Sequence, residues 1–367
     1  ELTILSREYE SSDLLYNDHD LAPDILQGEV RSFRHKLSVR VETLLVFLVF
    51  LISKSLAKLF LSPRQKRFIK MLKNHDFVIQ VGGSFLVDHY GISQFEYILL
   101  AKLARKRIYL AGHSYGPFRT FRSKLVAKKL LPLVERNFYR EVKSKELLES
   151  LGIKNIHRGA DTAWLINDSK KIFKPTKVIG MTLRDLYPFN KDLGVSQEEF
   201  EDKAAMFIDS MNRKGYKVVI YSTCTGFGGY WKDDRIVGMR VKKLVENQEM
   251  VDVFLNDVDD IELGFLLKDC DLVIGTRLHS AIIAMTFGTP AFTIYYEHKS
   301  LGIIQRVAES SKCIRIDELD SPNTYSLVLE TLEKIDEEHK TLEGKLIEEQ
   351  KLASSMIQEI LNLESAS

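Results

Sequence analysis

Cysteine, proline and long apolar runs are scarce in this chain of 367 residues. Its three cysteines, Cys224, Cys270 and Cys313, are too few and too scattered for a disulfide framework or a zinc knuckle. Eight prolines and twenty glycines exclude collagen and low-complexity sequence. The opening residues, ELTILSREYE, lack the basic and then apolar plan of a secretory signal. We therefore expect a reduced, folded protein of the cytoplasm.

The chain also lacks an excess of charge of either sign. Fifty-two lysines and arginines stand against 51 acidic residues, so no overall basic field recruits nucleic acid. Apolar residues make up 45% and charged residues 28%, as in soluble globular proteins. At roughly 100–200 residues per domain, the length predicts two domains. We see no clustering of histidine, cysteine and acidic residues typical of a metal site and expect no metal.

One segment, residues 41–61, resembles a membrane element. Its uncharged apolar core runs only over 43–53, about half of the ~20 residues needed to cross a bilayer. Cations follow it at Lys54, Lys58, Arg64, Lys66, Arg67, Lys70 and Lys73. The segment fits either an amphipathic helix buried in the first domain or a helix lying flat on an anionic leaflet. The second reading predicts peripheral contact through 41–73 with the inner face of the plasma membrane.

Short apolar runs alternate with helical patterns along the rest of the chain. Strands are expected at 77–81, 107–111 and 136–140, and again at 178–183, 217–222, 251–255, 271–275 and 290–295. This alternation predicts an α/β fold with parallel sheets. The restart of the pattern predicts domains at 1–172 and 173–324, joined by a linker at 173–176.

The two ends of the chain carry further expectations. Residues 325–367 read as a helical tail, either an amphipathic helix packing one apolar face or a helix for oligomerisation. Residues 2–5 look like a strand in the middle of a domain. Because doubly wound domains usually carry a ligand loop after the first strand, we expect the first βα unit to lie outside this sequence.

Polar side chains at the carboxyl ends of parallel strands are candidates for chemistry, because ligands bind there. The strand 271–275 leads into TRLHS at a helix start, where backbone N–H groups and Arg277 can hold a phosphate or carboxylate and His279 can transfer a proton. Arg184 repeats the arrangement after 178–183. Taken singly, these residues also fit structural roles: an ion pair for Arg277, a helix start for His279 and a salt bridge to Asp185 for Arg184.

Other candidates are less specific. After the strand 290–295, Lys299 can add a positive charge to the same site, and Glu297 can orient it or act as a base. In the first domain, the candidates for binding acceptor hydroxyls are Gly83, Ser84, Asp88, His89 and His113. The Gly82-Gly83-Ser84 turn lacks both the Walker lysine and the spacing of a dinucleotide loop.

The sequence DLVIGTRLHSA of 271–281, followed by Gly288-Thr289-Pro290 and the loop YYEHKS of 295–300, resembles the polysaccharide pyruvyl transferase family. The elements GGSF at 82–85, GHSYGPF at 112–118 and DTAW at 161–164 agree in order and spacing. The likeness covers roughly residues 1–320 and is strongest to the colanic-acid branch. The family's N-terminal loop with Asn and Gly-Asp is absent, and His113 replaces its glutamine.

This resemblance implies two Rossmann-like domains facing a cleft, similar to GT-B glycosyltransferases. It implies phosphoenolpyruvate as co-substrate, no cofactor, and a glycan or lipid-linked oligosaccharide acceptor whose hydroxyls receive a pyruvate ketal. The donor residues expected are Arg184, Arg277, Leu278, His279, Ser280 and Lys299, of which Arg277, His279 and Lys299 are catalytic. The runner-up is a GT-B nucleotide-sugar glycosyltransferase, with Glu297 as its acidic residue. A non-catalytic glycan-binding scaffold is the third hypothesis.

Overall fold

The computed structural model describes residues 2–7, 9–16, 18–27, 33–88, 90–166, 174–187, 194–226, 232–295, 302–307 and 312–365. The chain divides into two compact units. Unit 1 comprises Glu1–Thr162 and Leu352–Ser367, and unit 2 comprises Ala163–Lys351. Each unit is built on its own parallel sheet, as the alternating pattern of strands and helices predicts.

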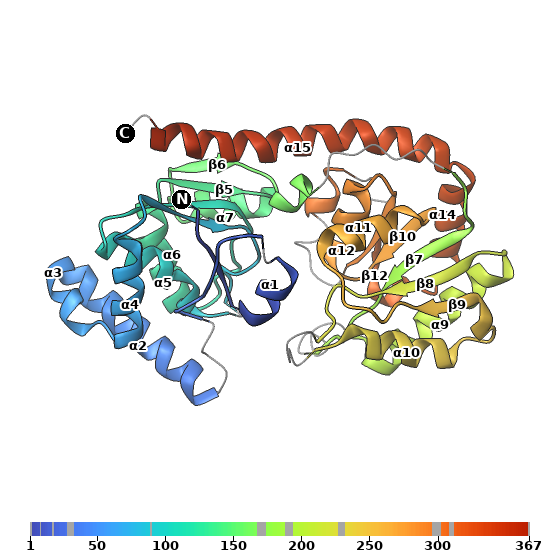
Figure 1. Cartoon of the computed structure of the whole chain (residues 1–367), viewed down its shortest axis with the longest axis horizontal. Helices are drawn as coiled ribbons and strands as arrows, with labels where there is room; N and C mark the ends of the chain where they lie inside the picture. Colours follow the sequence, from blue (N-terminus) through green and yellow to red (C-terminus); the bar gives the residue numbers. More distant parts are fainter. Residues whose placement is uncertain are drawn as a thin grey trace. The chain divides into compact units, whose positions relative to one another are not determined.

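Unit 1 contains a sheet of four parallel strands in sequential order. They are β3 (Phe77–Val81), β4 (Arg107–His113), β5 (Arg136–Tyr139) and β6 (Ile156–Arg158). The helices of this unit in Figure 1 are α1 (Tyr9–Leu15), α2 (Phe33–Ile52), α3 (Lys54–Ala57), α4 (Pro63–Leu72), α5 (Glu96–Leu103), α6 (Phe121–Leu130) and α7 (Val142–Ser150). Short 3₁₀ helices add η1 (Lys58–Phe60), η2 (Ile92–Phe95) and η3 (Leu131–Leu133).

The first residues form a small sheet of their own. β1 (Ile4–Ser6) pairs in parallel with β2 (Leu21–Pro23), and the two strands are separate from the four-stranded sheet. The strand expected at 2–5 therefore exists, but it does not join the main sheet of unit 1.

Unit 2 contains a sheet of six parallel strands in the order β12-β11-β10-β7-β8-β9. The strands are β7 (Val178–Thr182), β8 (Lys217–Tyr221), β9 (Val251–Val253), β10 (Leu272–Gly275), β11 (Ala291–Tyr295) and β12 (Cys313–Arg315). The helices are α9 (Gln197–Arg213), α10 (Asp234–Leu244), α11 (Asp260–Lys268), α12 (Leu278–Thr286) and α14 (Pro322–Glu333). The central strands are buried apolar runs, as strands covered on both faces must be.

Local signals explain where several helices begin. The Ser62 hydroxyl accepts a hydrogen bond from the backbone N–H of Gln65, the Gln65 side-chain oxygen accepts one from the backbone N–H of Ser62, and this capping box starts α4. Ser196 and Glu199 do the same for α9. These reciprocal bonds satisfy backbone N–H groups that a helix start leaves without partners.

The last helix, α15 (Ile335–Ser365), is shared by both units in the division of the chain (Figure 1, red). In unit 1 its Met356 and Ile360 pack against Tyr109 and Phe138, as an amphipathic helix with one apolar face predicts. In unit 2 its Glu349 forms an ion pair of 2.8 Å with Arg306.

The division differs from the expected domains in two respects. The boundary falls at 162/163 rather than 172/173, and the expected linker at 173–176 begins outside the described residues. The tail is not separate, because residues 325–351 belong to unit 2, where Val328 and Leu332 are in the core, and Leu352–Ser367 belongs to unit 1, where Met356 and Ile360 are buried. Among the described residues, no helix combines the length and apolarity that crossing a bilayer requires.

Candidate active site

The sheet of unit 2 reverses its strand order at β7. β8 pairs with one edge of this strand and β10 with the other, and open α/β sheets bind ligands beyond the carboxyl ends of such strands. Arg184 lies two residues beyond Thr182, the last residue of β7, and Arg277 lies two residues beyond Gly275, the last of β10. Thr182 and Gly275 are paired. The topology thus brings the two expected arginines to one edge of the sheet.

Asp234, the first residue of α10, connects the loops that carry these arginines. Its Oδ2 accepts a hydrogen bond of 2.5 Å from Nε of Arg277, and its Oδ1 accepts one of 3.3 Å from the backbone of Asp185. The Asp234 side chain is fully buried, whereas 23% of the Arg277 side chain is exposed. The ion pair expected for Arg277 therefore exists, and it orients the guanidinium without removing it from the surface.

Arg184 is held more deeply. It is 6% exposed, and its Nε donates to the backbone carbonyl of Asp185 at 3.1 Å. Its own carbonyl accepts from Nε2 of Gln197, at the start of α9, at 3.4 Å. These bonds fix the backbone after β7, so the position of the Arg184 guanidinium is set by the fold.

Lys232 is a third cation at this edge, and sequence reasoning missed it. Its Nζ donates to backbone carbonyls of the loop after β7, including that of Asp185 at 3.4 Å. Burial lowers the pKa of Lys232, and repulsion from Arg184 and Arg277 adds to this, against the attraction of Asp185. Lys232 and Arg184 donate to the same backbone oxygen, that of Asp185, so these two cations lie next to each other.

The expected residues after Arg277 take different places. Arg277 occupies the N-cap position of α12, His279 in the first turn is exposed, and Leu278 is half-buried. Ser280 is buried, and its Oγ donates to the carbonyl of Arg277 at 2.6 Å and shares a 2.7 Å hydrogen bond with Thr182. The Ser280 hydroxyl therefore fastens the loop after β10 to the end of β7, and its contact with a donor stays a prediction.

In unit 1, Gly82 and Gly83 form the turn after β3. A Cβ on Gly82 would lie 2.1 Å from the carbonyl oxygen of Gly112, and one on Gly83 would lie 2.3 Å from the ring of Phe85. The carbonyl of Gly83 also accepts from the backbone N–H of Ser114 at 3.1 Å. Close packing explains both glycines, and contact of Gly83 with an acceptor stays a prediction.

A buried polar network joins the strand ends of unit 1. At its centre is Arg140, whose Nε donates to Ser114 at 2.9 Å and whose Nη2 donates to Ser84 at 3.1 Å. Nη1 of Arg140 donates to the carboxylate of Asp161, and Ser114 donates to Glu141 at 2.9 Å. Ser84 is thus held in place by Arg140, which follows β5 and has no motif around it that would have revealed it.

His113 and Asp88 lie within the interior contacts of the same unit. His113 is completely buried, with Nε2 3.0 Å from the carbonyl oxygen of Gln80. Burial lowers the pKa of His113 to about 4, so the imidazole is neutral at pH 7. The Asp88 carboxylate accepts from the backbone N–H of Arg119. The burial of His113 argues against its direct contact with a sugar, and both side chains shape the loops around them.

Three expected residues, His89, Glu297 and Lys299, lie outside the described residues, and their roles stay predictions.

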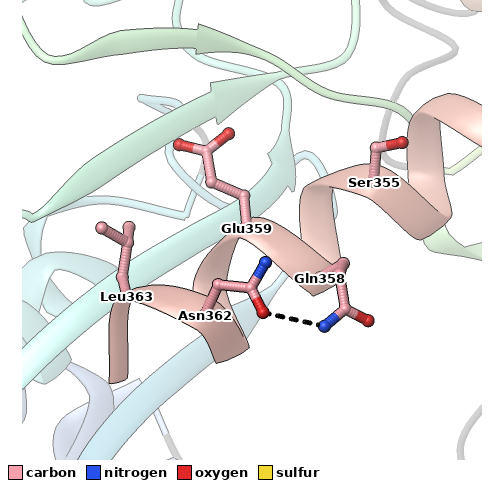
Figure 2. Close-up of a pocket in the computed structure, with 5 residues that line it drawn as sticks. All are labelled: Ser355, Gln358, Glu359, Asn362 and Leu363. Atoms are coloured by element: carbon pink, nitrogen blue, oxygen red, sulfur yellow. Dashed lines mark hydrogen bonds between the residues drawn. The ribbon is translucent and has the colours of Figure 1, made fainter. Parts of the chain in front are cut away.

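A separate pocket lies on the C-terminal part of α15 (Figure 2). It is lined by Ser355, Gln358, Glu359, Asn362 and Leu363. Gln358 donates to Asn362 at 3.0 Å, and Glu359 accepts from Arg136 at 3.1 Å. No expected site residue lines this pocket, and its polar groups are engaged in contacts along α15 and with β5, so we do not assign the active site to it.

Comparison with known proteins identifies the family of this chain. The family model for polysaccharide pyruvyl transferase matches residues 19–298, about three quarters of the chain. The chain belongs to the polysaccharide pyruvyl transferase family. It is 38% identical over 311 residues to the amylovoran biosynthesis protein AmsJ of Erwinia amylovora, covering 81% of this chain and 75% of that protein. The chain is therefore a transferase of polysaccharide biosynthesis. The colanic-acid branch stays a prediction.

Solved structures share the fold at low identity. The UDP-GlcNAc 2-epimerase of Neisseria meningitidis, bound to UDP-GlcNAc, gives a TM-score of 0.58 at 12% identity over 98% of this chain and 91% of its own. HepE of Anabaena, in complex with UDP and glucose, gives 0.51 at 13% identity over 83% and 82%. These similarities confirm the expected α/β, GT-B-like class with two Rossmann-like units.

Proposed function

We propose that this enzyme transfers the pyruvyl group of phosphoenolpyruvate to sugar hydroxyls of an exopolysaccharide repeat unit, forming a pyruvate ketal and releasing phosphate. The observation that carries the proposal is the group of three cations, Arg184, Lys232 and Arg277, at the carboxyl ends of β7, β8 and β10. Family membership supplies the reaction class, and these charges supply a fit to a small, highly charged donor.

The charge of phosphoenolpyruvate suits this group of side chains. Its phosphate and carboxylate are separate anions, and guanidinium groups can hold each one through paired hydrogen bonds. The N-terminus of α12 follows Arg277 directly and adds backbone N–H groups and the positive end of a helix dipole. In this proposal the donor's charge is met by side chains and backbone, and the reaction uses no cofactor.

The proposed reaction has two steps at C2: one hydroxyl adds, and a second hydroxyl then replaces phosphate. A proton reaches the methylene carbon of the donor, C2 becomes oxocarbenium-like, and the oxygen of one sugar hydroxyl bonds to it while losing its proton. The C2–O bond to phosphate then breaks, phosphate takes a proton, and a second hydroxyl closes the ketal with loss of its proton. His279 is the proposed proton donor to the carbon or to the departing phosphate, because it is the exposed imidazole beside Arg277.

The acceptor is proposed to be a glycan or a lipid-linked oligosaccharide bound through unit 1, where Ser84 lies at a strand end. Asp88, His89 and Glu297 remain the candidates for activating its hydroxyl. Lys299 is the further proposed donor contact.

The proposal is tested by phosphorus and proton NMR of the purified enzyme with phosphoenolpyruvate and a panel of synthetic galactosides, glucosides and mannosides. We expect phosphate release only in the presence of an accepted glycoside, together with a new pyruvate ketal. Parallel reactions with UDP-sugars address the glycosyltransferase alternative. Release of UDP with sugar transfer, and no reaction of phosphoenolpyruvate with any glycoside, would overturn the proposal.

Exchange of Lys232 for methionine is expected to weaken phosphoenolpyruvate binding by about 10- to 100-fold, as the loss of a charged hydrogen bond predicts. Because the pKa of Lys232 is lowered, wild-type affinity should fall as pH rises through a range below that of an ordinary lysine. That alkaline fall should be absent from the variant. Calorimetric titrations across pH measure both effects.

Lys217→Met is the matched control. Lys217 is the first residue of β8, at the amino end of the strand and away from the three cations, and it pairs with Asp252 at 2.6 Å. An unchanged pH profile in Lys232→Met would remove Lys232 from the donor site.

A further inference from the structure

The helix α2 exposes a continuous apolar stripe in unit 1. Leu37, Val41, Leu45, Leu48 and Ile52 are all exposed, and Val41 and Ile52 are 58% and 81% exposed. Their spacing of three or four residues places them on one face of the helix. Isolated exposed apolar residues are ordinary, but a stripe along sixteen residues of one helix is not.

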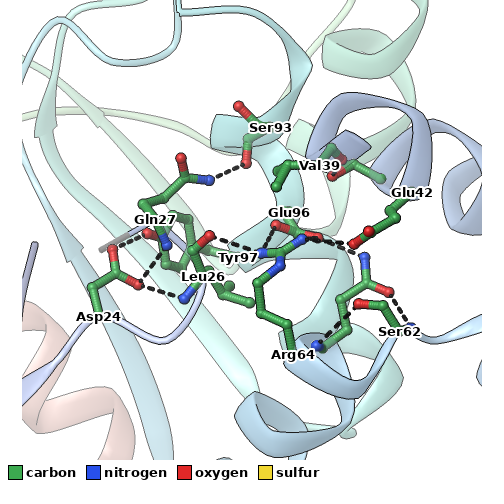
Figure 3. Close-up of polar contacts among 12 residues, drawn as sticks. Asp24, Leu26, Gln27, Val39, Glu42, Ser62, Arg64, Ser93, Glu96 and Tyr97 are labelled. Carbon is green, nitrogen blue, oxygen red and sulfur yellow. Dashed lines mark hydrogen bonds and ion pairs between the residues drawn. The ribbon is translucent and has the colours of Figure 1, made fainter. Parts of the chain in front are cut away.

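The opposite face of α2 is anchored in the core. Val46, Phe47 and Phe50 are buried within the apolar core of unit 1. Glu42 accepts from Nη2 of Arg64 at 3.4 Å, and Arg64 also donates to Glu96 at 2.8 Å (Figure 3).

This network joins α2 to α4 and α5 from within. Gln65 donates to Glu96 at 2.6 Å, and Arg64 also donates to the carbonyl of Leu26 at 2.8 Å (Figure 3). The burial of Val46, Phe47 and Phe50 fixes the orientation of α2, and the half-buried Glu42 adds its ion pair with Arg64. The apolar stripe is therefore a surface presented by the fold and not the result of a loosely attached helix.

The apolar surface continues beyond α2. Leu56 in α3 and Leu59 and Phe60 in η1 are exposed, and Leu59 is 75% exposed. Both elements contact α2. We call the exposed apolar residues of α2, α3 and η1 the α2 face; they are Leu37, Val41, Leu45, Leu48, Leu51, Ile52, Leu56, Leu59 and Phe60.

The segment that carries the α2 face is strongly basic. Residues 33–73 contain ten lysines and arginines and one carboxylate, Glu42, although the whole chain has a net charge of only +1. Arg40, Lys54 and Lys58 are exposed on the same elements as the α2 face. Further exposed cations lie on α4 at Lys66, Arg67 and Lys70. Positive charge is thus concentrated around the apolar surface, and a second basic stretch of unit 1 lies at 119–129, with five lysines and arginines and no carboxylate.

We infer that the α2 face docks on an anionic lipid bilayer, lying in the plane of the membrane. Leucine, isoleucine and phenylalanine side chains enter the boundary between headgroups and acyl chains, and lysine and arginine side chains contact anionic headgroups. Charge complementarity favours this occupant over a second copy of the chain, because two copies of this basic segment repel each other. The expected cytoplasmic, peripheral location belongs to this inference.

Docking of this kind keeps the enzyme at the surface where a lipid-linked acceptor is displayed. This benefit rests on the proposed function, but the contact itself needs only the α2 face and can be measured without donor or acceptor.

The test is co-sedimentation of the whole protein with vesicles of phosphatidylglycerol and phosphatidylcholine, compared with phosphatidylcholine alone. We expect binding to the anionic vesicles, weaker binding to neutral ones, and release by salt. The double variant Leu45→Glu/Leu48→Glu should lower the partition coefficient at least tenfold. Lys54→Glu/Lys58→Glu should lower it on anionic vesicles alone.

Phe121→Glu and Val142→Glu are matched controls, since both residues are exposed apolar positions of unit 1 outside this segment, 79% and 63% exposed. Circular dichroism and binding of phosphoenolpyruvate check the fold of every variant. Failure of wild-type protein to bind anionic vesicles, or equal binding by Leu45→Glu/Leu48→Glu, overturns the inference. If light scattering shows that the wild-type protein is a dimer and that Leu45→Glu/Leu48→Glu is a monomer, and neither protein binds vesicles, the α2 face is assigned to self-association instead. If the protein binds anionic vesicles but does not bind phosphoenolpyruvate, the proposed function fails and this inference stands.

Discussion

Replacing Arg277 with lysine is expected to lower kcat/KM for phosphoenolpyruvate-dependent transfer by about 100- to 1,000-fold while the chain stays folded. Lysine keeps a positive charge for the buried carboxylate of Asp234 but loses the planar fork that can hold a second anion. Arg277→Ala should abolish transfer. The alanine variant also leaves Asp234 without this partner, which costs about 3 kcal/mol or more when a pair is buried.

The measurement is a rate of phosphate release with saturating acceptor, alongside thermal unfolding of each variant. Arg213→Ala serves as the control, because Arg213 is an exposed arginine at the end of α9 and pairs with Glu246 at 3.2 Å. Near-normal transfer by Arg277→Lys with an unchanged KM for the donor would show that the guanidinium does not hold phosphoenolpyruvate.

Replacing His279 with glutamine is expected to reduce kcat by about 10²- to 10⁴-fold, the range for loss of a general acid. The affinity for phosphoenolpyruvate should change little, because glutamine keeps hydrogen-bonding capacity in a similar volume. The side chain is exposed in the first turn of α12, so the substitution should leave the fold unchanged. Single-turnover rates and donor titrations separate the two quantities.

His339→Gln, a change on α15, provides the comparison for His279→Gln. Added imidazole should restore part of the activity of His279→Ala, since a free base can enter the space that the side chain leaves. A proportional loss of donor affinity and rate, with no rescue by imidazole, would make His279 a binding residue and not the proton donor.

Most strands that the sequence predicts correctly contain continuous apolar runs, and β5 (RNFY) is an exception. β7 and β10 are buried runs of four or five residues, and both were predicted within a residue or so of their ends. β6 and β12 are three residues each, IHR and CIR, with no apolar pattern, and they were missed because only pairing with a neighbour makes them strands. Short edge strands of this kind depend on tertiary contacts.

The candidate site was predictable in the same uneven way. Arg277 and His279 stand in a recognisable motif, and Arg184 directly follows a clear strand. Lys232 and Asp234 stand more than forty residues before Arg277 in the chain. They lie at the same end of the sheet as Arg277 because β8 and β10 are placed on either side of β7. No spacing in the sequence records that order. The sequence also does not show whether the Ser280 hydroxyl is exposed to a ligand or buried, because burial depends on how the strands are ordered in the sheet.

The three cations proposed to bind the donor, Arg184, Lys232 and Arg277, all lie in loops of unit 2. Under the proposed division of labour, mutation or recombination in the other half of the gene can change which glycan is accepted without rebuilding the pocket for the pyruvyl donor. Related enzymes can therefore change their polysaccharide acceptor while the unit proposed to bind the pyruvyl donor is inherited unchanged.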